Sequence, residues 1–118
     1  MDTIQKKFQL QLLFKIKKIV DSDDGGNNFI INRTQKNIEF IREYGLQNED
    51  IKNIVRQLSI DDCFSGPEKD RNPKFSGMLI KFNPLFENVK LYVKIRIEND
   101  EKAVCISIHE FGKYDEVE

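Results

Sequence analysis

His109, the only histidine of the 118-residue chain, ends a segment in which a tyrosine and several cations alternate with aliphatic residues. An imidazole, whose reference pKa is about 6.5, can accept or donate a proton near neutral pH. A tyrosine hydroxyl can hydrogen-bond to an anion, and lysine and arginine side chains bind anions by charge. The segment from Val89 to His109 therefore combines a group for proton transfer with anion-binding groups, which are Lys90, Tyr92, Lys94 and Arg96.

Two alternating runs predict how these residues are arranged. From Val89 to Ile97 the odd positions are aliphatic and the even positions are polar or aromatic, which is the period of a half-buried strand. The run from Ala103 to His109 alternates in the same way. Asn99-Asp100, between the two runs, is an acceptable turn pair. We therefore predict an antiparallel hairpin.

A two-residue turn at Asn99-Asp100 fixes the expected pairing of the strands. The core-facing pairs would be Ile95 with Val104, Val93 with Ile106 and Leu91 with Ile108; the pairs on the other face would be Lys94 with Cys105, Tyr92 with Ser107 and Lys90 with His109. A shift by one residue would turn the apolar side chains of one strand away from the core, so this register is strongly preferred. We predict that Tyr92, Lys94 and His109 lie on one solvent-facing surface, within reach of a single phosphate.

The stretch before the hairpin predicts a further strand and a long loop. Residues 78–82 have a strand pattern, and the connection 83–88 would return this strand antiparallel to the next, placing Lys81 beside Lys90. Residues 65–77 contain two prolines and two glycines, and an irregular stretch of this length in a compact domain is usually functional or disordered. This loop carries the cations Lys69, Arg71 and Lys74, together with Glu68, which could enter the site or pair with Arg71 to hold the loop shut.

The N-terminal segment predicts a helix from about Ile4 to about Val20, capped by Asp2 or Thr3. Its apolar stripe at helical spacing consists of Phe8, Leu12, Ile16 and Ile19, with Leu13 and Val20 beside them. The alternation of Phe8, Leu10, Leu12 and Phe14 leaves a short strand as an alternative.

The remaining N-terminal half predicts a short strand and two more helices. Residues 29–31 fit a strand, a second helix follows a cap at Asn32 or Thr34 and stops at Gly45, and a third begins at Asn48. Short links predict that these two helices form an antiparallel pair, followed by one turn capped by Ser59. The expected fold is a single α+β domain over residues 1–118, with the helices packed on one face of a twisted antiparallel sheet and a frayed acidic tail at 113–118.

The net charge of −1 is unevenly distributed along the chain. Residues 65–97 contain seven cations and three acids, a local charge of +4, which suits a few phosphates rather than broad binding to nucleic acid. Cys63 and Cys105 form no metal-binding pair and predict free, partly buried thiols of a cytoplasmic protein. No apolar run reaches the length of a membrane helix, so no membrane partner is expected.

Three segments, in this order, resemble the MqsR family of type II toxin–antitoxin toxins, which are RelE-like mRNA interferases. They are Ile60-Asp61-Asp62-Cys63-Phe64-Ser65-Gly66-Pro67-Glu68-Lys69-Asp70-Arg71, Leu91-Tyr92-Val93-Lys94-Ile95 and Val104-Cys105-Ile106-Ser107-Ile108-His109. The resemblance implies a RelE-like fold and cleavage of mRNA, with or without the ribosome, that needs neither a metal ion nor a cofactor. It also implies a cognate antitoxin protein as a partner.

The resemblance also implies roles for individual residues. The family tyrosine falls at Tyr92 and a basic position near the end of the final strand falls at His109, whereas the family lysine falls at Ser65 or Gly66. Cleavage of RNA by this chemistry needs a base, an acid and cations that stabilise the phosphorane. The candidate catalytic residues are Tyr92, Lys94 and His109; the candidate RNA-binding residues are Lys69, Arg71, Lys74, Lys81, Lys90 and Arg96, of which Lys69, Lys74 or Lys81 would replace the family lysine.

A second function class fits the same cationic face. The chain could be a non-catalytic module that binds RNA or an acidic protein there, because the overall charge is close to neutral and the family lysine is absent.

Overall fold

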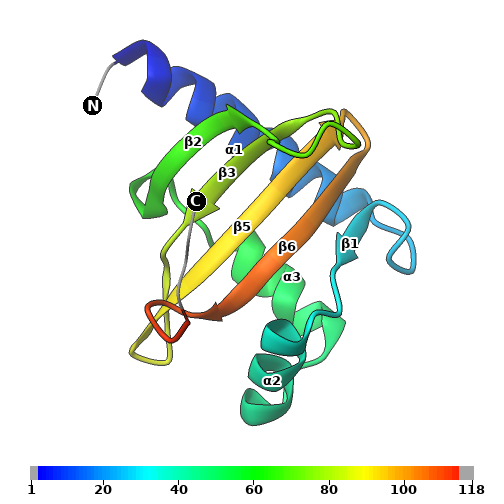
Figure 1. Ribbon diagram of the computed structural model, residues 1–118, viewed down its shortest axis with the longest axis vertical. Coiled ribbons are helices and arrows are strands. Elements are labelled where there is room, and N and C mark those ends of the chain that lie inside the picture. Colours follow the sequence, from blue (N-terminus) through cyan, green and yellow to red (C-terminus); the bar gives the residue numbers. More distant parts are fainter. Residues whose placement is uncertain (1–2, 115–118) are drawn as a thin grey trace.

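The computed structural model describes residues 3–114, which form an α+β fold in which helices pack against a mixed sheet (Figure 1). The elements are α1 (Thr3–Ser22), β1 (Phe29–Ile31), α2 (Gln35–Tyr44), α3 (Asn48–Arg56), the short 3₁₀ helix η1 (Ile60–Asp62), β2 (Cys63–Lys69), β3 (Met78–Phe82), β4 (Leu85–Phe86), β5 (Val89–Asn99) and β6 (Lys102–Glu110). The strand order is β1-β6-β5-β3-β2, with β4 paired to β5. The expected cap at Asp2 and the tail beyond Tyr114 lie outside the described residues.

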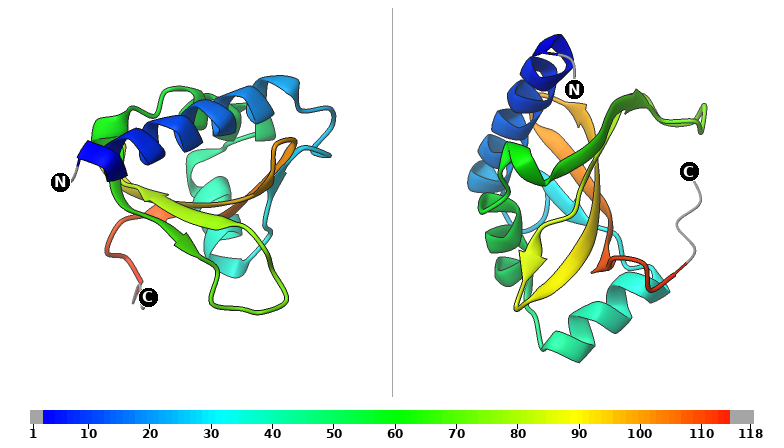
Figure 2. Two further views of the ribbon diagram at one scale, coloured as in Figure 1. Left: turned by 90° about the horizontal axis from the view of Figure 1, so that it is seen from above. Right: turned by 90° about the vertical axis from the view of Figure 1, so that its left-hand side faces the viewer.

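Helices α1 and α3 cover one face of the sheet, and α2 packs against β6 (Figure 2). The expected antiparallel pairing of α2 with α3 is therefore wrong, because α3 lies beside α1. The core between these helices and the sheet includes Leu13, Ile16, Ile51, Val55, Leu58, Phe82, Leu91, Val93, Ile95 and Ile108. Among the described helices, α1 and α3 lie on the same side of the sheet, and α2 lies at one end of it.

The first helix is confirmed, and the alternative of an N-terminal strand is wrong. Its expected apolar stripe is only partly correct, because Phe8 is 55% exposed while Gln9 is 1% exposed. Gln9 turns inward because its Nε2 donates a hydrogen bond of 2.7 Å to the carbonyl of Gly66 on β2. The buried side of α1 therefore includes a polar contact to β2 besides its apolar residues.

The sheet is mixed rather than antiparallel throughout, because β1 pairs in parallel with β6. The β5–β6 hairpin is present, but its turn is Asp100-Glu101, since Asn99 pairs with Lys102. The expected register is thus wrong, and an irregularity between Ile97 and Asn99 lengthens β5 by one residue relative to β6 near this turn.

A second irregularity in the hairpin lies at Ile106 and is filled by a side chain from α2. Lys94 pairs with Ser107 and Ile95 with Cys105, so Ile106 has no partner on β5. The buried Asn37 donates to the carbonyls of Ile106 and Asn32 and accepts from the amide of Ile108, at 2.9 to 3.0 Å. The extra residue Ile106 on β6 offsets the extra residue on β5 near the turn. Beyond this bulge Tyr92 therefore pairs with His109.

The region expected to be a loop from residue 65 to residue 77 is partly a strand. Strand β2 runs to Lys69, and the connection to β3 is residues 70–77. Gly66, at φ +103°, lies where an added Cβ would be 2.6 Å from the Leu79 carbonyl oxygen, so only glycine fits this irregular part of β2. The connection 83–88 also differs from expectation, because it forms β4, and Lys81 therefore pairs with Lys94 and not with Lys90.

Candidate functional site

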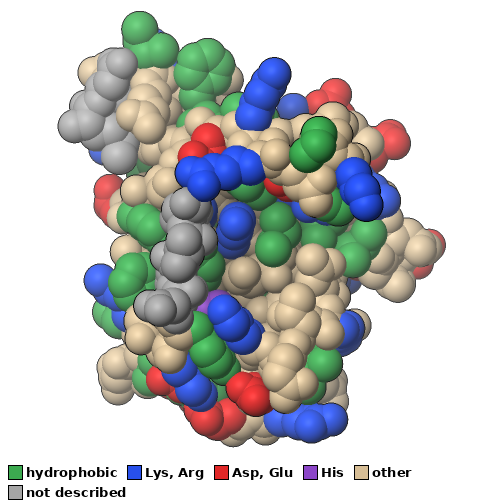
Figure 3. All heavy atoms as spheres, in the orientation of Figure 1, with side chains coloured by type: hydrophobic (Ala, Val, Ile, Leu, Met, Phe, Trp, Pro, Cys, Tyr) green, Lys and Arg blue, Asp and Glu red, His purple; other side chains and the backbone are tan. Residues whose placement is uncertain are grey.

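The sheet face opposite α1 and α3 brings together the chemically active side chains predicted from the sequence. The pairings of Lys81 with Lys94 and of Tyr92 with His109 place these four residues on it, and Arg96 follows at the next position of the same face. Lysine and arginine side chains gather with hydrophobic ones on this side of the molecule (Figure 3). We call Lys81, Tyr92, Lys94, Arg96 and His109 the polar face.

The other predicted RNA-binding residues lie around the polar face rather than within it. Lys90 is exposed at the beginning of β5, with its Nζ 5.5 Å from the centre of the Phe111 ring. Lys69 ends β2, and Arg71 and Lys74 are exposed in the following loop. The expected pair of Glu68 with Arg71 is not the contact that Glu68 makes, because Glu68 Oε1 lies 3.4 Å from Lys81 Nζ.

Tyr92 and His109 stack on each other at the end of the polar face near α2. Their ring centres are 5.3 Å apart and the planes are inclined by 23°. The expectation that they face solvent is wrong, because Tyr92 is 4% exposed and His109 is 2% exposed. Aromatic residues from outside β5 and β6 cover them: Phe64 on β2 and Phe111 contact Tyr92, and Tyr114 contacts His109 edge-on.

The His109 ring is oriented by the backbone. Its Nδ1 lies 3.0 Å from the carbonyl oxygen of Glu110. Because a carbonyl oxygen only accepts, this contact is a hydrogen bond when the proton is on Nδ1. In the neutral ring with that tautomer, Nε2 carries the lone pair and is the nitrogen that can accept a proton.

Lys81 and Lys94 place two ammonium groups side by side under partial cover. Lys81 is 2% exposed, and Lys94 is half-buried on the neighbouring strand. Burial lowers the pKa of Lys94, and the charge of Lys81 lowers it further. The cost of holding two cations together would fall if an anion bound between them.

Arg96 is enclosed on three sides at the other end of the polar face. Glu98 Oε2 accepts from Nε at 3.1 Å and lies 2.9 Å from Nη2, while Asp70 Oδ2 lies 3.3 Å from Nη1. The Phe75 ring stacks on the guanidinium, with its centre 3.9 Å from Cζ. Arg96 is consequently 7% exposed.

Sequence reasoning missed the aromatic cover of the polar face. Tyr114 is fixed on α2 by a 2.7 Å hydrogen bond from its hydroxyl to Glu39 Oε2, and Lys36 Nζ lies 4.8 Å from its ring centre. Residues 113 and 114, expected to be frayed, are therefore held in place. Phe64 was expected in the turn capped by Ser59 but lies on β2, and the sequence pattern around Phe111 does not reveal what this ring covers.

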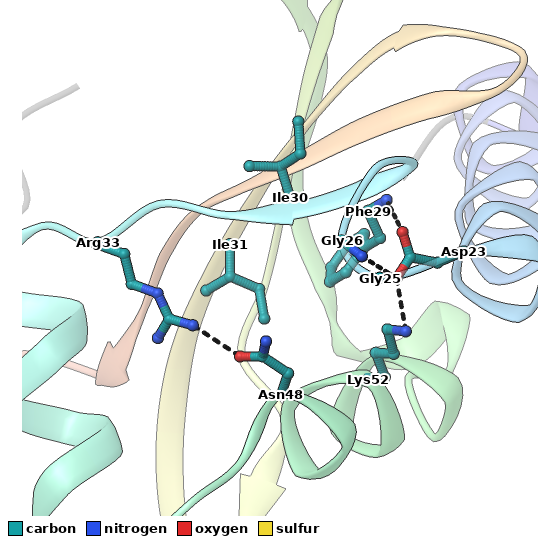
Figure 4. A pocket seen from close by; sticks show the side chains of 9 residues that line it. All are labelled: Asp23, Gly25, Gly26, Phe29, Ile30, Ile31, Arg33, Asn48 and Lys52. Carbon is teal, nitrogen blue, oxygen red and sulfur yellow. Dashed lines mark hydrogen bonds and ion pairs between the residues drawn. The ribbon is translucent and has the colours of Figure 1, made fainter.

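A pocket of about 310 Å³ lies away from the polar face, between α3 and the turn after α1 (Figure 4). Its charged groups contact one another: Lys52 Nζ is 2.6 Å from Asp23 Oδ2, and Arg33 Nη2 donates to Asn48 Oδ1 at 2.8 Å. Asp23 also accepts hydrogen bonds from the amides of Gly26, Asn28 and Phe29. The charged groups of this pocket therefore bind one another and the turn backbone, so we interpret the pocket as a structural feature of the turn.

Other reactive groups give no second site within residues 3–114. Cys63 and Cys105 are buried free thiols, as expected, and burial raises the pKa of Cys105 to about 12. The described residues contain no group of three or more His, Cys, Asp and Glu side chains that could hold a metal ion. Among their helices, none is both long and apolar enough to cross a membrane. Comparison of the chain with protein-family models and with curated proteins finds no match.

Proposed function

We propose that this protein is a metal-independent endoribonuclease toxin that cleaves mRNA in the cytoplasm and is neutralised by a cognate antitoxin. The observation that carries the proposal is the juxtaposition of a histidine, a tyrosine and two lysines on one sheet face. The resemblance of three segments to MqsR-family toxins, and with it a RelE-like fold, adds to it. The ribosome is a further candidate partner.

The proposed reaction transfers a phosphoryl group within the RNA. His109 Nε2 takes the proton of a ribose 2′-hydroxyl, whose oxygen attacks the neighbouring phosphorus atom. The bond from phosphorus to the 5′-oxygen breaks, a proton reaches that oxygen, and the products are a 2′,3′-cyclic phosphate and a 5′-hydroxyl. Lys94 supports this step by stabilising the phosphorane and supplying the proton, for which its lowered pKa is suited, while the Tyr92 hydroxyl binds a phosphate oxygen.

The burial of Tyr92 and His109 favours a second candidate function. A base that takes a proton from a substrate must come within hydrogen-bonding distance of it, yet only 2% of His109 is exposed. If the aromatic cover remains closed, the exposed cations around the polar face bind RNA or an acidic protein without cleaving it. Lys69, Arg71, Lys74 and Lys90 would then be the main contacts.

A single-turnover assay on a defined RNA tests the proposal. His109→Ala should lower the cleavage rate by about 10²- to 10⁴-fold, which is the usual contribution of a positioned acid or base. It should leave the affinity for an uncleavable RNA nearly unchanged, because a neutral imidazole adds little attraction in the ground state. Tyr92→Phe should lose activity if the hydroxyl acts on the phosphate and retain it if the ring only stacks on a base.

Two controls make this assay decisive. His109→Gln keeps a polar side chain in the buried site and so separates loss of chemistry from loss of folding, which thermal melting checks. Lys18→Ala removes an exposed cation from α1, behind the sheet, and should change neither binding nor rate. An undiminished rate in His109→Ala would remove the histidine from the mechanism, and wild-type protein that binds RNA without cleaving it would establish the binding module instead.

A further inference from the structure

The carboxylates that contact the polar face come from β2 and the residue that follows it. Glu68 Oε1 lies 3.4 Å from Lys81 Nζ, and Asp70 Oδ2 lies 3.3 Å from Arg96 Nη1. These two acids are two residues apart, as are Lys94 and Arg96 on β5. Lys94 and Arg96 lie on β5, where two residues span about 6.6 Å, whereas the two acids contact Lys81 on β3 and Arg96 on β5.

The contacts of Asp70 and Phe75 attach the 70–77 loop to the sheet at Arg96. Within the loop the hydrogen bonds are local: Asp70 Oδ1 accepts from the Asn72 amide at 2.9 Å, and the Asn72 carbonyl accepts from the Phe75 amide at 3.0 Å. The loop leaves β2 and crosses toward the turn between β5 and β6 on the side of the sheet opposite α1 (Figures 1 and 2). The side chains of Asp70 and Phe75 therefore both hold the loop against Arg96.

Arg96 offers its ligands a geometry that a phosphate matches. A guanidinium has five N–H donors in a planar fork, which suits two oxygens of a carboxylate or of a phosphate. Glu98, on the same strand, takes Nε and Nη2, and the Asp70 carboxylate takes Nη1. A phosphate at the position of the Asp70 carboxylate would keep the charge-assisted bond to Nη1 without needing the loop.

We propose that Arg96 and the Lys81–Lys94 pair bind two consecutive phosphates of single-stranded RNA, at the positions that the Asp70 and Glu68 carboxylates occupy here. The 70–77 loop leaves Arg96 when the RNA binds, so Asp70 competes with the substrate. This inference rests on the proposed function, since it assigns the phosphates of that same substrate. Release of the loop would uncover Arg96, which is 7% exposed here, at one end of the polar face.

The competition is tested with a fluorescent, uncleavable oligoribonucleotide whose dissociation constant is measured by anisotropy. Asp70→Asn should bind about tenfold more tightly than the wild type, the effect of one lost charge-assisted contact. Asp61→Asn, which removes an exposed acid from η1, is the control for the change in net charge. In an Arg96→Ala background Asp70→Asn should have no further effect, because the partner of Asp70 is absent.

The assignment of two phosphates is tested by the salt dependence of the same binding. Lys94→Ala and Arg96→Ala should each flatten the slope of log affinity against log salt by about 0.7, and the double variant by about 1.4. A double variant no flatter than either single variant would mean one shared phosphate and would overturn the assignment.

The outcomes separate this inference from the proposed function. Equal affinities of Asp70→Asn and Asp61→Asn overturn the competition while leaving RNA binding in place. Should Asp70→Asn melt at a lower temperature than the wild type, Phe75→Ala replaces it, since that variant loosens the loop and keeps every charge, and it too should bind more tightly. Absence of RNA binding in the wild type and all variants at low salt removes the proposed function itself.

Discussion

Asp23 shows how one buried carboxylate organises the turn between α1 and β1. Burial alone would raise its pKa, but the Lys52 ammonium and three backbone amides outweigh burial and lower the pKa to about 2 from an ordinary value of 3.8. A carboxyl with a depressed pKa in the folded state stabilises the fold above its unfolded pKa. The stabilisation is lost as the pH falls through the folded value.

Asp23→Asn should therefore remove a pH-dependent part of the stability. The lowered pKa corresponds to about 2 kcal/mol, which the wild type should lose between about pH 4 and pH 2 and the variant should lack at every pH. Urea unfolding at a series of pH values measures both. Asp24→Asn, at an exposed position in the same turn, is the matched control, and equal losses in the two variants would contradict this account of Asp23.

Asn37 is a single residue on which the arrangement of β6 depends. Its amide satisfies the Ile106 carbonyl and the Ile108 amide beside the β6 bulge. Asn37→Ala should lower the free energy of unfolding by about 3 kcal/mol, because it leaves buried backbone groups unpaired. Arg42→Ala, at an exposed position of α2, should cost less than about 0.5 kcal/mol. Chemical denaturation compares the two variants; similar values would mean that the bulge does not need the amide.

At the scale of elements, α1 presents hydrophobic side chains on both sides. Ile16 is fully buried against the sheet, whereas Phe14 is 68% exposed. Ile16→Ala should cost about 2–5 kcal/mol of unfolding free energy, the range for large-to-small changes in a core, and Phe14→Ser should leave stability almost unchanged. Thermal melting of the two variants tests this, and a large loss in Phe14→Ser would place the outer side of α1 in a contact that the isolated chain does not show.

The elements with strong periodicity were predictable, and their long-range pairing was not. The β5–β6 hairpin follows from alternation along each strand, which depends on neighbouring residues only. Its register was mispredicted because the turn lies at Asp100-Glu101 and because each strand contains an irregularity. The irregularity at Ile106 is stabilised by Asn37, which lies 69 residues away in the sequence. The parallel pairing of β1 with β6 likewise depends on contacts between distant segments, which no local pattern encodes.

In the candidate site, too, local features were predictable and long-range contacts were not. Alternation was enough to place Tyr92, Lys94 and His109 on one face, even though the predicted cross-strand partners were wrong. Exposure could not be predicted in this way, because the residues that bury Tyr92 and His109 come from outside the two strands. Asp70 contacts Arg96, which lies 26 residues further along the chain, and the sequence showed only that both charges were present.

At the scale of the whole molecule, positive charge lies on both sides of the sheet. Residues 3–20 contain five lysines and no acid, while residues 65–97 carry +4, which leaves −10 for the rest of the chain. Because α1 lies behind the sheet, its lysines cannot touch a ligand on the polar face. A ligand there meets only the local cations, so the salt dependence of binding should reflect few phosphates.

The order of the strands has a consequence for how the protein is made. The sheet is centred on β5 and β6, which follow every other described element along the chain. During synthesis α1, β1 and α3 leave the ribosome while the strands that will cover their apolar sides have not yet been translated. Since contacts between distant segments form late, a nascent chain cannot assemble the Tyr92–His109 pair until β6 has been made. Each copy of the protein therefore lacks the assembled Tyr92–His109 pair for most of its own translation.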